Sequence, residues 1–378
     1  MIAVFEEMVA HKPTLFNEEQ LHTRAKLHKL QPFKVKQILF ELYKNQNTER
    51  EAMTTLSKEL RSQLQSDFDL LAIELVELVE AADTTKFAFK TRDGHLIEAI
   101  LMYHWQHEKY VQNQTPKLNR ITLCISSQVG CAMQCLFCVT GKLGFRKNLT
   151  REEMISQVLF ANSYIKKRFW KKEDGTNYSV RNIVFMGMGE PLLNYDHTKM
   201  AIKLMLQQDR LSLGRRHVTI STCWIIPGIE QLIKDQVDVK LAISLHAPNQ
   251  ELRNQIMPIG KSYPLDKLMT TIDQYVEATN NRIFYEYIMI KDLTDTPALA
   301  HELVQLLKGR LAHINLIPYN ENPAIHLQES SKLAIETFKQ ILESWGLTVT
   351  VRDSMGREAK GACGQLGYEK VKGQQLGF

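Results

Sequence analysis

Three closely spaced cysteines constrain this chain more than any other feature. Cys131, Cys135 and Cys138 form the pattern C-x3-C-x2-C, directly after the run 122–130. Three thiolates at this spacing can hold three irons of a four-iron cluster, whose full ligand set is usually four cysteines. The pattern therefore predicts an iron–sulfur cluster with one iron left open to another ligand.

Two other interpretations of the cysteines are open at this point. A structural zinc site takes four Cys or His ligands, and Cys124 or a distant histidine could supply the fourth. A disulfide framework is disfavoured, because disulfide-dense chains are small and exported, whereas this one has 378 residues, six cysteines and no secretory signal. The spacing, with Phe137 just before the last cysteine, resembles the radical SAM superfamily, in which S-adenosylmethionine (SAM) binds the open iron.

The composition indicates a soluble globular enzyme. Hydrophobic residues make up 44% and charged residues 24% of the chain, and no apolar stretch is long enough to cross a bilayer. The N-terminus carries Glu6 and Glu7 and no basic segment, so it does not resemble a signal peptide. We therefore expect a cytoplasmic protein without membrane association, in a compartment that keeps cluster thiols reduced.

The charge distribution leaves room for a polyanionic partner. The formal net charge is +5, and basic residues gather at 24–44, at 166–172 and at 215–217. The second cluster also contains Phe169 and Trp170. Each cluster alone is more often a solvated face than a binding site. Taken together, the three clusters are equally well explained as a nucleic-acid-binding surface or as solvated surface.

The chain divides into four predicted regions. Residues 1–70 carry helical periodicity and form an accessory domain, which carries the first basic cluster and is the candidate docking domain for a nucleic acid. Residues 71–118 alternate in polarity around the turn signal Asp93-Gly94, which predicts a small antiparallel β extension followed by a loop from His104 to Asn119. Residues 119–351 alternate between strands and helices, and residues 352–378 form a Gly-rich C-terminal segment.

The third region predicts the fold class, which is α/β. Six strands are expected at 121–126, 182–188, 217–223, 239–246, 283–290 and 313–318, followed by a last strand at 347–352. Clear helices are expected at 151–169, 265–278, 297–308 and 332–345. Repeated β-α units imply a parallel sheet with right-handed crossovers. Since six strands are too few for an eight-stranded barrel, we expect a partial (β/α)6 barrel, with a doubly wound sheet as the alternative.

Polar groups stand at the predicted carboxyl ends of these strands, where such sheets bind ligands. They lie at 187–191, 221–222, 244–246 and 318–320. The cysteine triplet follows the first strand in the same way. One polar group at the end of nearly every strand, beside a cluster, indicates a SAM site.

Five strings carry a closer resemblance: CISSQVGCAMQCLFC, MGMGEPLLN, ISLHAPN, NLIPYN and ACGQL. They resemble the RlmN/Cfr family of radical SAM RNA methyltransferases, and the similarity runs over nearly the whole chain to Leu366. The resemblance implies methylation of carbon 2 or carbon 8 of an adenosine in RNA, with 23S rRNA as the first candidate and tRNA as the second. It also implies a [4Fe-4S] cluster, two SAM molecules per turnover and a reducing electron donor such as flavodoxin. We expect a monomer.

The resemblance also implies the site residues. The cluster would be held by Cys131, Cys135 and Cys138. The SAM contacts would be Gly189, Glu190, Ser221, Ser244, Leu245, His246 and Asn320.

Three further residues match the family's catalytic positions. Cys363 matches the cysteine whose sulfur carries the methyl group, and Cys124 matches the cysteine that resolves the protein–RNA intermediate through a transient disulfide with Cys363. Glu98 matches the proton acceptor. Cys223 matches no role and is expected to be a core residue.

The chain departs from the family at a few positions. Lys360 replaces an acidic residue before Cys363, Trp224 stands where a small residue is usual, and the loop between Glu98 and Cys124 is longer. None of these departures changes a cluster ligand. They put in doubt which RNA, and which carbon of the adenosine, is the target. The alternatives are another radical SAM enzyme, such as a glycyl-radical activase, and a non-catalytic RNA-binding protein with a structural metal.

Overall fold

A ten-stranded open sheet organises the protein. The computed structural model describes residues 11–106, 117–169, 171–172, 175–352 and 355–367. The strands are ordered β1-β2-β3-β4-β7-β8-β9-β10-β11-β12. Their bounds are Ile73–Glu80, Thr84–Thr91, Leu96–Gln106, Lys117–Cys124, Asn182–Phe185, Val218–Thr222, Lys240–Ser244, Ile283–Met289, Ala312–Pro318 and Val349–Val351. From β4 to β12 neighbouring strands are parallel, so the predicted partial barrel is confirmed.

The antiparallel extension belongs to the same sheet. β1, β2 and β3 pair antiparallel, and β3 also pairs with β4 so that Ile100 lies opposite Cys124. The predicted boundary at 118/119 therefore falls within a strand. The prediction of a loop from His104 to Asn119 is wrong at both ends. At the first end, pairing with β4 extends β3 to Gln106, and at the second end β4 already begins at Lys117. Residues 107–116 lie outside the described residues.

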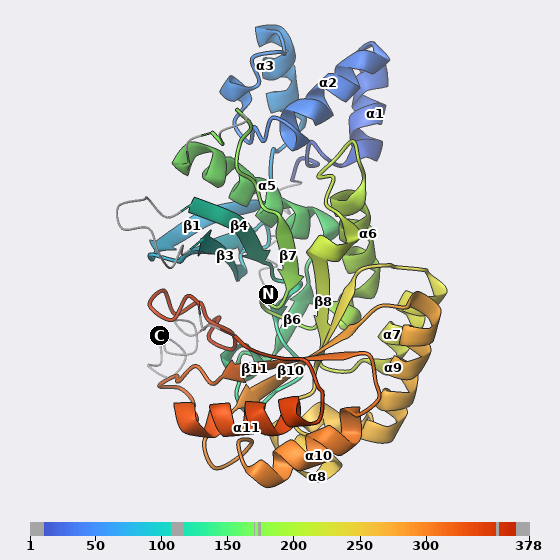
Figure 1. The fold of residues 1–378 in the computed structure, drawn as a ribbon. Helices are drawn as coiled ribbons and strands as arrows, with labels where there is room; N and C mark the ends of the chain where they lie inside the picture. Colours follow the sequence, from blue (N-terminus) through green and yellow to red (C-terminus); the bar gives the residue numbers. More distant parts are fainter. Residues whose placement is uncertain (1–10, 107–116, 170, 173–174, 353–354, 368–378) are drawn as a thin grey trace, which may run out of the picture.

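Helices cover the outer side of the curved sheet (Figure 1). They are α5 (Arg151–Arg168), α6 (Tyr195–Leu206), α7 (Ile226–Lys234), α8 (Gln250–Ile256), α9 (Leu265–Thr279), α10 (Pro297–Leu307) and α11 (Lys332–Ser344). The side chains of Ile183, Ile220, Ile243 and Leu316 on the parallel strands are buried. None of the helices among the described residues is long and apolar enough to cross a membrane.

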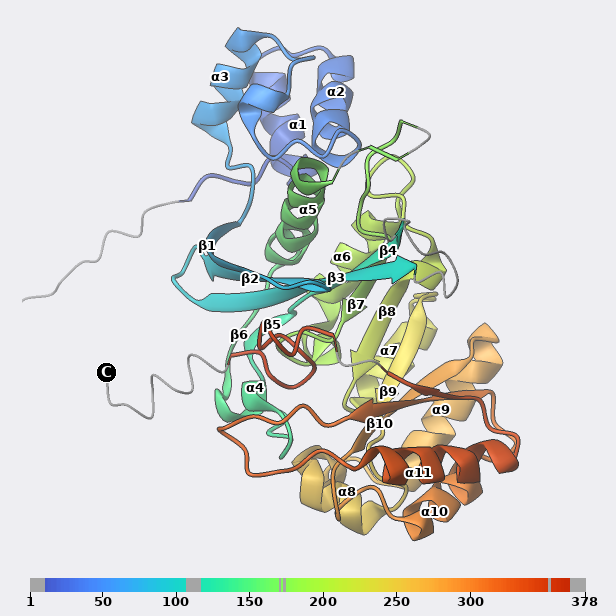
Figure 2. The same cartoon turned by 60° about the vertical axis from the view of Figure 1, so that its left-hand side comes forward.

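The N-terminal helices stand over one end of α5 in both views (Figures 1 and 2). They are α1 (Glu18–Leu27), α2 (Pro32–Tyr43) and α3 (Lys58–Asp67). Arg210, from the segment after α6, donates to both carboxylate oxygens of Glu18 at 2.7 Å. Such a bidentate pair fixes geometry as well as adding energy, so it orients α1 against the barrel.

The basic cluster at 166–168 turns out to have structural partners. Lys166 donates to the backbone oxygen of Asn45 and to Oδ1 of Asn47, both at 2.7 Å. Lys167 and Arg168 pair with Glu49 and Glu80. These three cations hold the end of α5 against the helical region and β1. The sequence analysis did not foresee these structural partners, because they come from distant parts of the chain.

An aromatic cluster fixes the antiparallel strands to α5. The ring of Phe87 on β2 lies 5.4 Å from Phe160 and 5.2 Å from Tyr164, both edge to face. Phe89 packs on Phe160 in the same way at 5.2 Å. Phe87 and Phe89 are fully buried. Because β2 pairs with the strand that carries Glu98, this contact sets the position of that carboxylate.

We predict that Phe87→Ala lowers the free energy of unfolding by about 3–5 kcal/mol, since it removes a buried ring and leaves a cavity. The matched control is Phe33→Ala, because Phe33 is 59% exposed and its loss should change stability by no more than about 0.5 kcal/mol. Urea unfolding followed by circular dichroism measures both. Equal effects of the two substitutions would contradict the packing described here.

Candidate active site at the mouth of the partial barrel

A cavity of about 630 Å³ lies inside the curved sheet and runs from the amino ends of the parallel strands to their carboxyl ends. Its lining includes Cys124 at the end of β4, Cys138, Asn320 after β11, and Cys363 from the C-terminal segment. The volume lies within the usual range for ligand sites. Four parts of the chain that are far apart in sequence therefore contribute polar or nucleophilic groups to one space.

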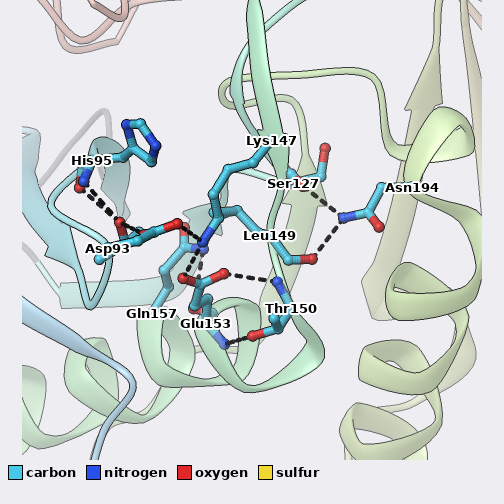
Figure 3. Close-up of polar contacts among 10 residues, drawn as sticks. Asp93, His95, Ser127, Lys147, Leu149, Thr150, Glu153, Gln157 and Asn194 are labelled. Carbon is cyan, nitrogen blue, oxygen red and sulfur yellow. Dashed lines mark hydrogen bonds and ion pairs between the residues drawn. The ribbon is translucent and has the colours of Figure 1, made fainter. Parts of the chain in front are cut away.

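The loop that carries the cysteine triplet is held by a polar network (Figure 3). Strands β5 (Gln128–Gly130) and β6 (Phe145–Asn148) pair on either side of the triplet. Lys147 on β6 donates to Asp93 at 2.8 Å and to Glu153 at 2.9 Å. Glu153 also forms a capping box with Thr150 at the start of α5. The loop is thus fixed to both the β2–β3 turn and a helix.

Two side-chain amides fix the segment before the triplet. Gln157 on α5 accepts from the N–H of Ser126 at 2.9 Å and donates to its carbonyl at 3.0 Å. Asn194 donates to the carbonyls of Ser127 and Leu149 at 2.8 and 2.7 Å, as Figure 3 shows. Because these amides are buried and satisfied, they hold the backbone rigidly.

The triplet thiols have the surroundings that cluster ligands need. Cys131 and Cys135 are buried and Cys138 is half-buried. Burial raises the pKa of Cys131 and of Cys138, while backbone N–H groups near each sulfur act in the opposite direction. A bound metal centre converts such thiols to thiolates, and hydrogen bonds to the sulfurs are a normal part of cluster sites. The residues therefore fit an iron–sulfur cluster.

The thiols are not arranged around a single ion. Among the described residues, no three His, Cys, Asp or Glu side chains are grouped so that they could hold one metal ion. A mononuclear zinc site needs such convergence. Cluster ligands do not, because each cysteine binds a different iron.

Glu190 is a buried carboxyl group at the end of β7. Its Oε1 accepts from the N–H of Leu192 at 2.9 Å and its Oε2 from the N–H of Cys223 at 2.6 Å. Burial raises the pKa of Glu190 to about 7, although these hydrogen bonds oppose the shift. A ligand ammonium group at this point would stabilise the charged form, which is what the predicted SAM contact requires.

Gly189 allows the backbone to reach Glu190. Its φ is +100°, and a Cβ at this position would lie 2.4 Å from Cβ of Gln128. No L-residue with a side chain fits there without displacing Gln128. Gln128 in turn accepts from the N–H of Glu190 at 2.8 Å. The glycine therefore makes the turn that presents the carboxylate.

The predicted contacts on β8 and β9 lie at the same end of the sheet. Ser221 is the second-last residue of β8, and Ser244 is the last residue of β9. Leu245 and His246 follow β9 and are buried. Nδ1 of His246 accepts from the N–H of Ile288 at 3.1 Å. Burial lowers the pKa of His246 to about 3, so the ring is neutral and Nε2 carries the proton.

His246 also links this end of the sheet to the cysteine loop. Its ring meets Phe137 edge to face, with the centroids 4.8 Å apart. Phe137 directly precedes Cys138 in the chain. The predicted ligand contacts on β9 are therefore in direct contact with the segment that would hold the cluster.

The C-terminal segment is tied to the cysteine loop by its backbone. In Figure 2 it lies between the β1–β3 strands and the β10–β12 strands. The N–H of Val139 donates to the carbonyl of Gly364 at 2.8 Å, and Oγ1 of Thr140 donates to the carbonyl of Leu366 at 2.9 Å. Asn320 donates to the carbonyl of Cys363 at 3.3 Å. These bonds bring Cys363 beside Cys138.

Cys124 and Cys363 face the same cavity and are both free thiols. Each thiol has a raised pKa, chiefly because of burial, and the charge of Cys363 contributes to the shift at Cys124. Arg352 opposes the shift at both cysteines. Its own partner is Glu286, at 3.6 Å. The sequence analysis missed Arg352, because nothing in its local sequence marks it as a neighbour of two cysteines.

Glu98 lies beside the cavity and binds the C-terminal segment. Its Oε2 accepts from the N–H of Gly367 at 2.6 Å, and its Oε1 lies 3.6 Å from Nζ of Lys86. Both side chains are largely buried, with 13% and 7% exposed. Lys86 was also missed by the sequence analysis, since its pairing with Glu98 depends on the β2–β3 register.

Two residues directly after β8 concern earlier expectations. Cys223, expected in the core, is partly buried and packs against the main hydrophobic core. Trp224, the departure from the usual small residue, has φ +94°, a conformation that costs a residue with a side chain about 1–2 kcal/mol. Its buried ring is stacked by Arg253, whose guanidinium carbon lies 3.1 Å from the ring centroid.

The mouth of the cavity at the amino ends of the strands is basic. Arg120, Arg216 and Lys240 line it there, Arg352 lines the cavity after β12, and Glu286 is the single acid of the lining among the described residues. The pKa of Lys240 is lowered by burial and by Arg120 and Arg216. A neighbouring groove of about 750 Å³ shares Arg120 with the cavity and adds further cations, Lys172 and Arg181. Such a surface attracts anions.

Comparison with known proteins identifies the family of the chain. Residues 125–303 match the Radical SAM superfamily. The chain is 39% identical over 344 residues to "Probable dual-specificity RNA methyltransferase RlmN" of Dictyoglomus thermophilum, covering 90% of this chain and 93% of the relative. It is 36% identical to "Probable dual-specificity RNA methyltransferase RlmN 2" of Protochlamydia amoebophila, covering 95% of each.

A solved structure is similar over the same extent. The crystal structure of a radical SAM methyltransferase from Sphaerobacter thermophilus superimposes with a TM-score of 0.83 at 36% sequence identity. The match covers 94% of this chain and 98% of that chain. The similarity therefore extends over nearly the whole chain.

We predict that Arg352→Met slows alkylation of Cys363 by iodoacetamide. Removing the guanidinium leaves burial unopposed, so the pKa of Cys363 rises and its reactive thiolate fraction falls, by up to about tenfold for each pKa unit. Arg352→Lys, which retains the charge, is the matched control and should react more nearly like the natural chain. Peptide mass spectrometry over a time course gives the rate for Cys363 alone. An unchanged rate in Arg352→Met would show that Arg352 does not act on this thiol.

Proposed function

The chain belongs to the RlmN family of radical SAM RNA methyltransferases, and we propose that it methylates carbon 2 or carbon 8 of an adenosine in 23S rRNA or tRNA. These amidine carbons have no nucleophilic lone pair, so ordinary transfer of a methyl cation fails. When bound, the [4Fe-4S] cluster and SAM supply the methyl group and a 5′-deoxyadenosyl radical. The observation that carries the proposal is the meeting of Cys363 and Cys124 in one cavity beside the triplet loop.

Cys363 is the proposed methyl carrier. Its sulfur receives the methyl group and later, as an S-methylene radical, adds to the adenine carbon. Support comes from its exposure to the cavity and from the backbone bonds that hold its neighbours Gly364 and Leu366 against Val139 and Thr140. Those bonds keep the carrier sulfur next to the loop that binds the cluster.

Cys124 is the proposed resolving residue. After addition the RNA is attached covalently to the Cys363 sulfur, and the Cys124 thiolate attacks that sulfur to form a transient disulfide and free the product. Support comes from its place in the cavity lining and from its electrostatic contact with Cys363. Arg352 assists by stabilising both thiolates.

Glu98 is the proposed proton acceptor for the target carbon, acting as general base. Nζ of Lys86 lies 3.6 Å from the Glu98 carboxyl group and orients it. The Glu98 carboxylate also accepts from the N–H of Gly367, only four residues after Cys363. The base and the methyl carrier are therefore connected through one short segment.

The SAM contacts follow from the groups at the strand ends. We assign the SAM amino group to Glu190, whose buried carboxyl lacks a cationic partner among the described residues and has a raised pKa. Gly189, Ser221, Ser244, Leu245, His246 and Asn320 complete the proposed contacts. The neutral His246 can donate through Nε2, and Asn320 joins this site to the Cys363 backbone.

RNA is proposed to enter over the basic mouth. Arg120 and Arg216 are exposed there, and an adenosine would leave its stack to reach the cavity. The helical region is proposed to dock a second part of the RNA. On it, Phe33 and Phe40 are exposed beside the exposed cations Lys29 and Lys36, and aromatic and basic groups together suit nucleic acid. We further propose that the enzyme works as a monomer with an electron donor such as flavodoxin.

The competing enzyme class is a glycyl-radical activase. Such an enzyme has no use for a pair of thiols that line the same cavity. The placement of Cys124 and Cys363 therefore favours RNA methylation over activation of a second protein.

We predict that the reconstituted enzyme, given SAM, a reductant and RNA from cells lacking its gene, produces 2-methyladenosine or 8-methyladenosine, detected by mass spectrometry of the digested RNA. Cys363→Ala should abolish the product, because no sulfur remains to carry the methyl group. Cys124→Ala should instead accumulate a covalent protein–RNA adduct, visible as a nuclease-sensitive shift on a denaturing gel. SAM cleavage without any RNA product in the natural chain would refute the proposed function.

We also predict that Arg120→Ala and Arg216→Ala each weaken RNA binding by about fivefold at physiological salt. If each arginine contacts a phosphate, the slope of log affinity against log salt should fall by about 0.7–0.9 per substitution. Lys332→Ala is the control, since Lys332 is an exposed lysine on α11 outside the cavity lining. Fluorescence anisotropy with labelled RNA at several salt concentrations measures both quantities. Equal slopes for all three variants would exclude the mouth as the RNA surface.

A further inference from the structure

Polar side chains line the inner face of the parallel sheet, where a closed barrel would have a packed core. Successive residues of a strand point to opposite faces of the sheet, and every second residue of a lining strand faces the cavity. On β4 and β11 these are Arg120, Thr122, Cys124, His313, Asn315 and Ile317. The interior of an eight-stranded barrel is filled by bulky branched side chains. Here the interior keeps a polar space that a ligand can enter.

The two ends of this space carry different chemistry. The thiols of Cys124 and Cys363 line the carboxyl end, and Lys240 and Phe284 line the amino end. β9 begins at Lys240 and ends at Ser244, so at about 3.3 Å per residue the two ends are about 13 Å apart. One adenine ring is shorter than this span. A base that reaches the thiols therefore leaves the amino-end groups to another part of the ligand.

Two aromatic rings meet at the amino end. Phe284 on β10 and His313 on β11 are register partners on neighbouring strands, and their ring centroids are 5.2 Å apart at an interplanar angle of 37°. Both residues are half-buried and line the cavity. Nε2 of His313 lies 2.8 Å from Oγ1 of Thr350, which fixes the imidazole. Rings that face a cavity in this way are suited to stack on a nucleic-acid base.

Three cations line the same end of the cavity. Nζ of Lys240 lies 5.4 Å from the centroid of the Phe284 ring. Arg120 and Arg216 are exposed at the edge of the cavity. Proteins that bind single-stranded nucleic acid combine cations that follow the backbone with rings that stack on the bases. The amino end has both kinds of group within one space.

The acid in the cavity lining does not neutralise these cations. Among the described residues the lining contains one acid, Glu286. Its Oε1 accepts from Nδ2 of Asn315 at 2.9 Å, and its Oε2 lies 3.6 Å from Nη1 of Arg352. By contrast, Arg168 and Arg210 outside the cavity are each paired with a carboxylate. The cations at the amino end are therefore left to an anionic ligand.

We propose that the amino end of the cavity is a subsite for the nucleotide next to the target adenosine in the RNA strand. The neighbouring base stacks on the Phe284 ring, with His313 beside it, and the adjoining phosphates pair with Lys240 and Arg216. Two successive nucleotides then lie along the cavity, which aims the target base at the thiols. This assignment depends on the proposed RNA substrate and adds which part of the RNA the amino end holds. Because every base can stack, the subsite positions the strand without reading its sequence.

The test measures binding of a labelled oligoadenylate, a short single-stranded RNA, to the reconstituted protein by fluorescence anisotropy. Phe284→Leu removes the ring face and should weaken binding about tenfold, whereas Phe284→Tyr retains the ring and should bind like the natural protein. Lys240→Met should lower the slope of log affinity against log salt by about 0.7, as expected for the loss of one phosphate contact with a single strand.

Trp345 and Lys308 provide matched controls. Nζ of Lys308 lies 4.6 Å from the centroid of the Trp345 ring, so this pair is also a cation over a ring, and neither residue belongs to the described lining of the cavity. Trp345→Leu and Lys308→Met should leave the affinity and the salt slope unchanged. Circular dichroism verifies that each variant is folded. If Phe284→Leu fails that check, Lys240→Met and crosslinking of the natural protein decide the result.

Photocrosslinking locates the stacked base in the natural protein. An oligoadenylate with one 5-iodouridine, a base that crosslinks to aromatic side chains stacked on it, is irradiated with the protein and the digest is analysed by mass spectrometry. We expect a crosslink on the tryptic peptide 283–291, which begins after Arg282, ends at Lys291 and contains Phe284.

Three outcomes each overturn the subsite. They are equal affinities of Phe284→Leu and Trp345→Leu, an unchanged salt slope in Lys240→Met, and crosslinks confined to peptides outside the cavity lining. None of these measurements involves methylation. Methylated RNA from a protein that fails them would refute the subsite alone, whereas an intact subsite without any methylated product would refute the proposed function alone.

Discussion

The hydrogen bond from the N–H of Val139 to the carbonyl of Gly364 joins the two halves of the site. One partner follows directly on the cysteine triplet, and the other follows directly on Cys363. Together with the bond from Thr140 to Leu366, it closes the cavity and sets the carrier sulfur against the cluster loop. The position of Glu98 depends on the same segment, since its carboxylate accepts from Gly367. Without this attachment the residues of the site would have no common space.

Burial controls the charges around that space. Glu190 has its pKa raised to about 7 and Arg253 has its pKa lowered to about 9, in both cases chiefly because each is removed from water. Buried charges without partners are unfavourable, so Glu190 suits a ligand with an ammonium group. Arg253 instead stacks on the buried Trp224 ring and donates to the carbonyl of Cys223. The mouth outside remains cationic and solvent-exposed, which suits a phosphate backbone.

Much of the fold was predictable, because the signals are local. The alternation of strands and helices, the helix bounds and the polar strand ends all depend on residues close together in sequence. The errors arose where distant contacts decide the outcome. β3 runs past His104 because β4 pairs with it, and Lys166 serves structure because Asn45 and Asn47 fold against it. The pairing of Lys86 with Glu98 depends on strand register in the same way.

The sequence by itself determined the cluster loop, the order of strands and helices and, through its motifs, the family. Spacing and periodicity are properties of the backbone over a few residues, so they can be read without the fold. Only the tertiary structure decided which thiols share a space. It brought Cys363 and Cys124 to one cavity. Such neighbours depend on how the whole sheet curves and on what packs across it, which no short stretch of the chain records.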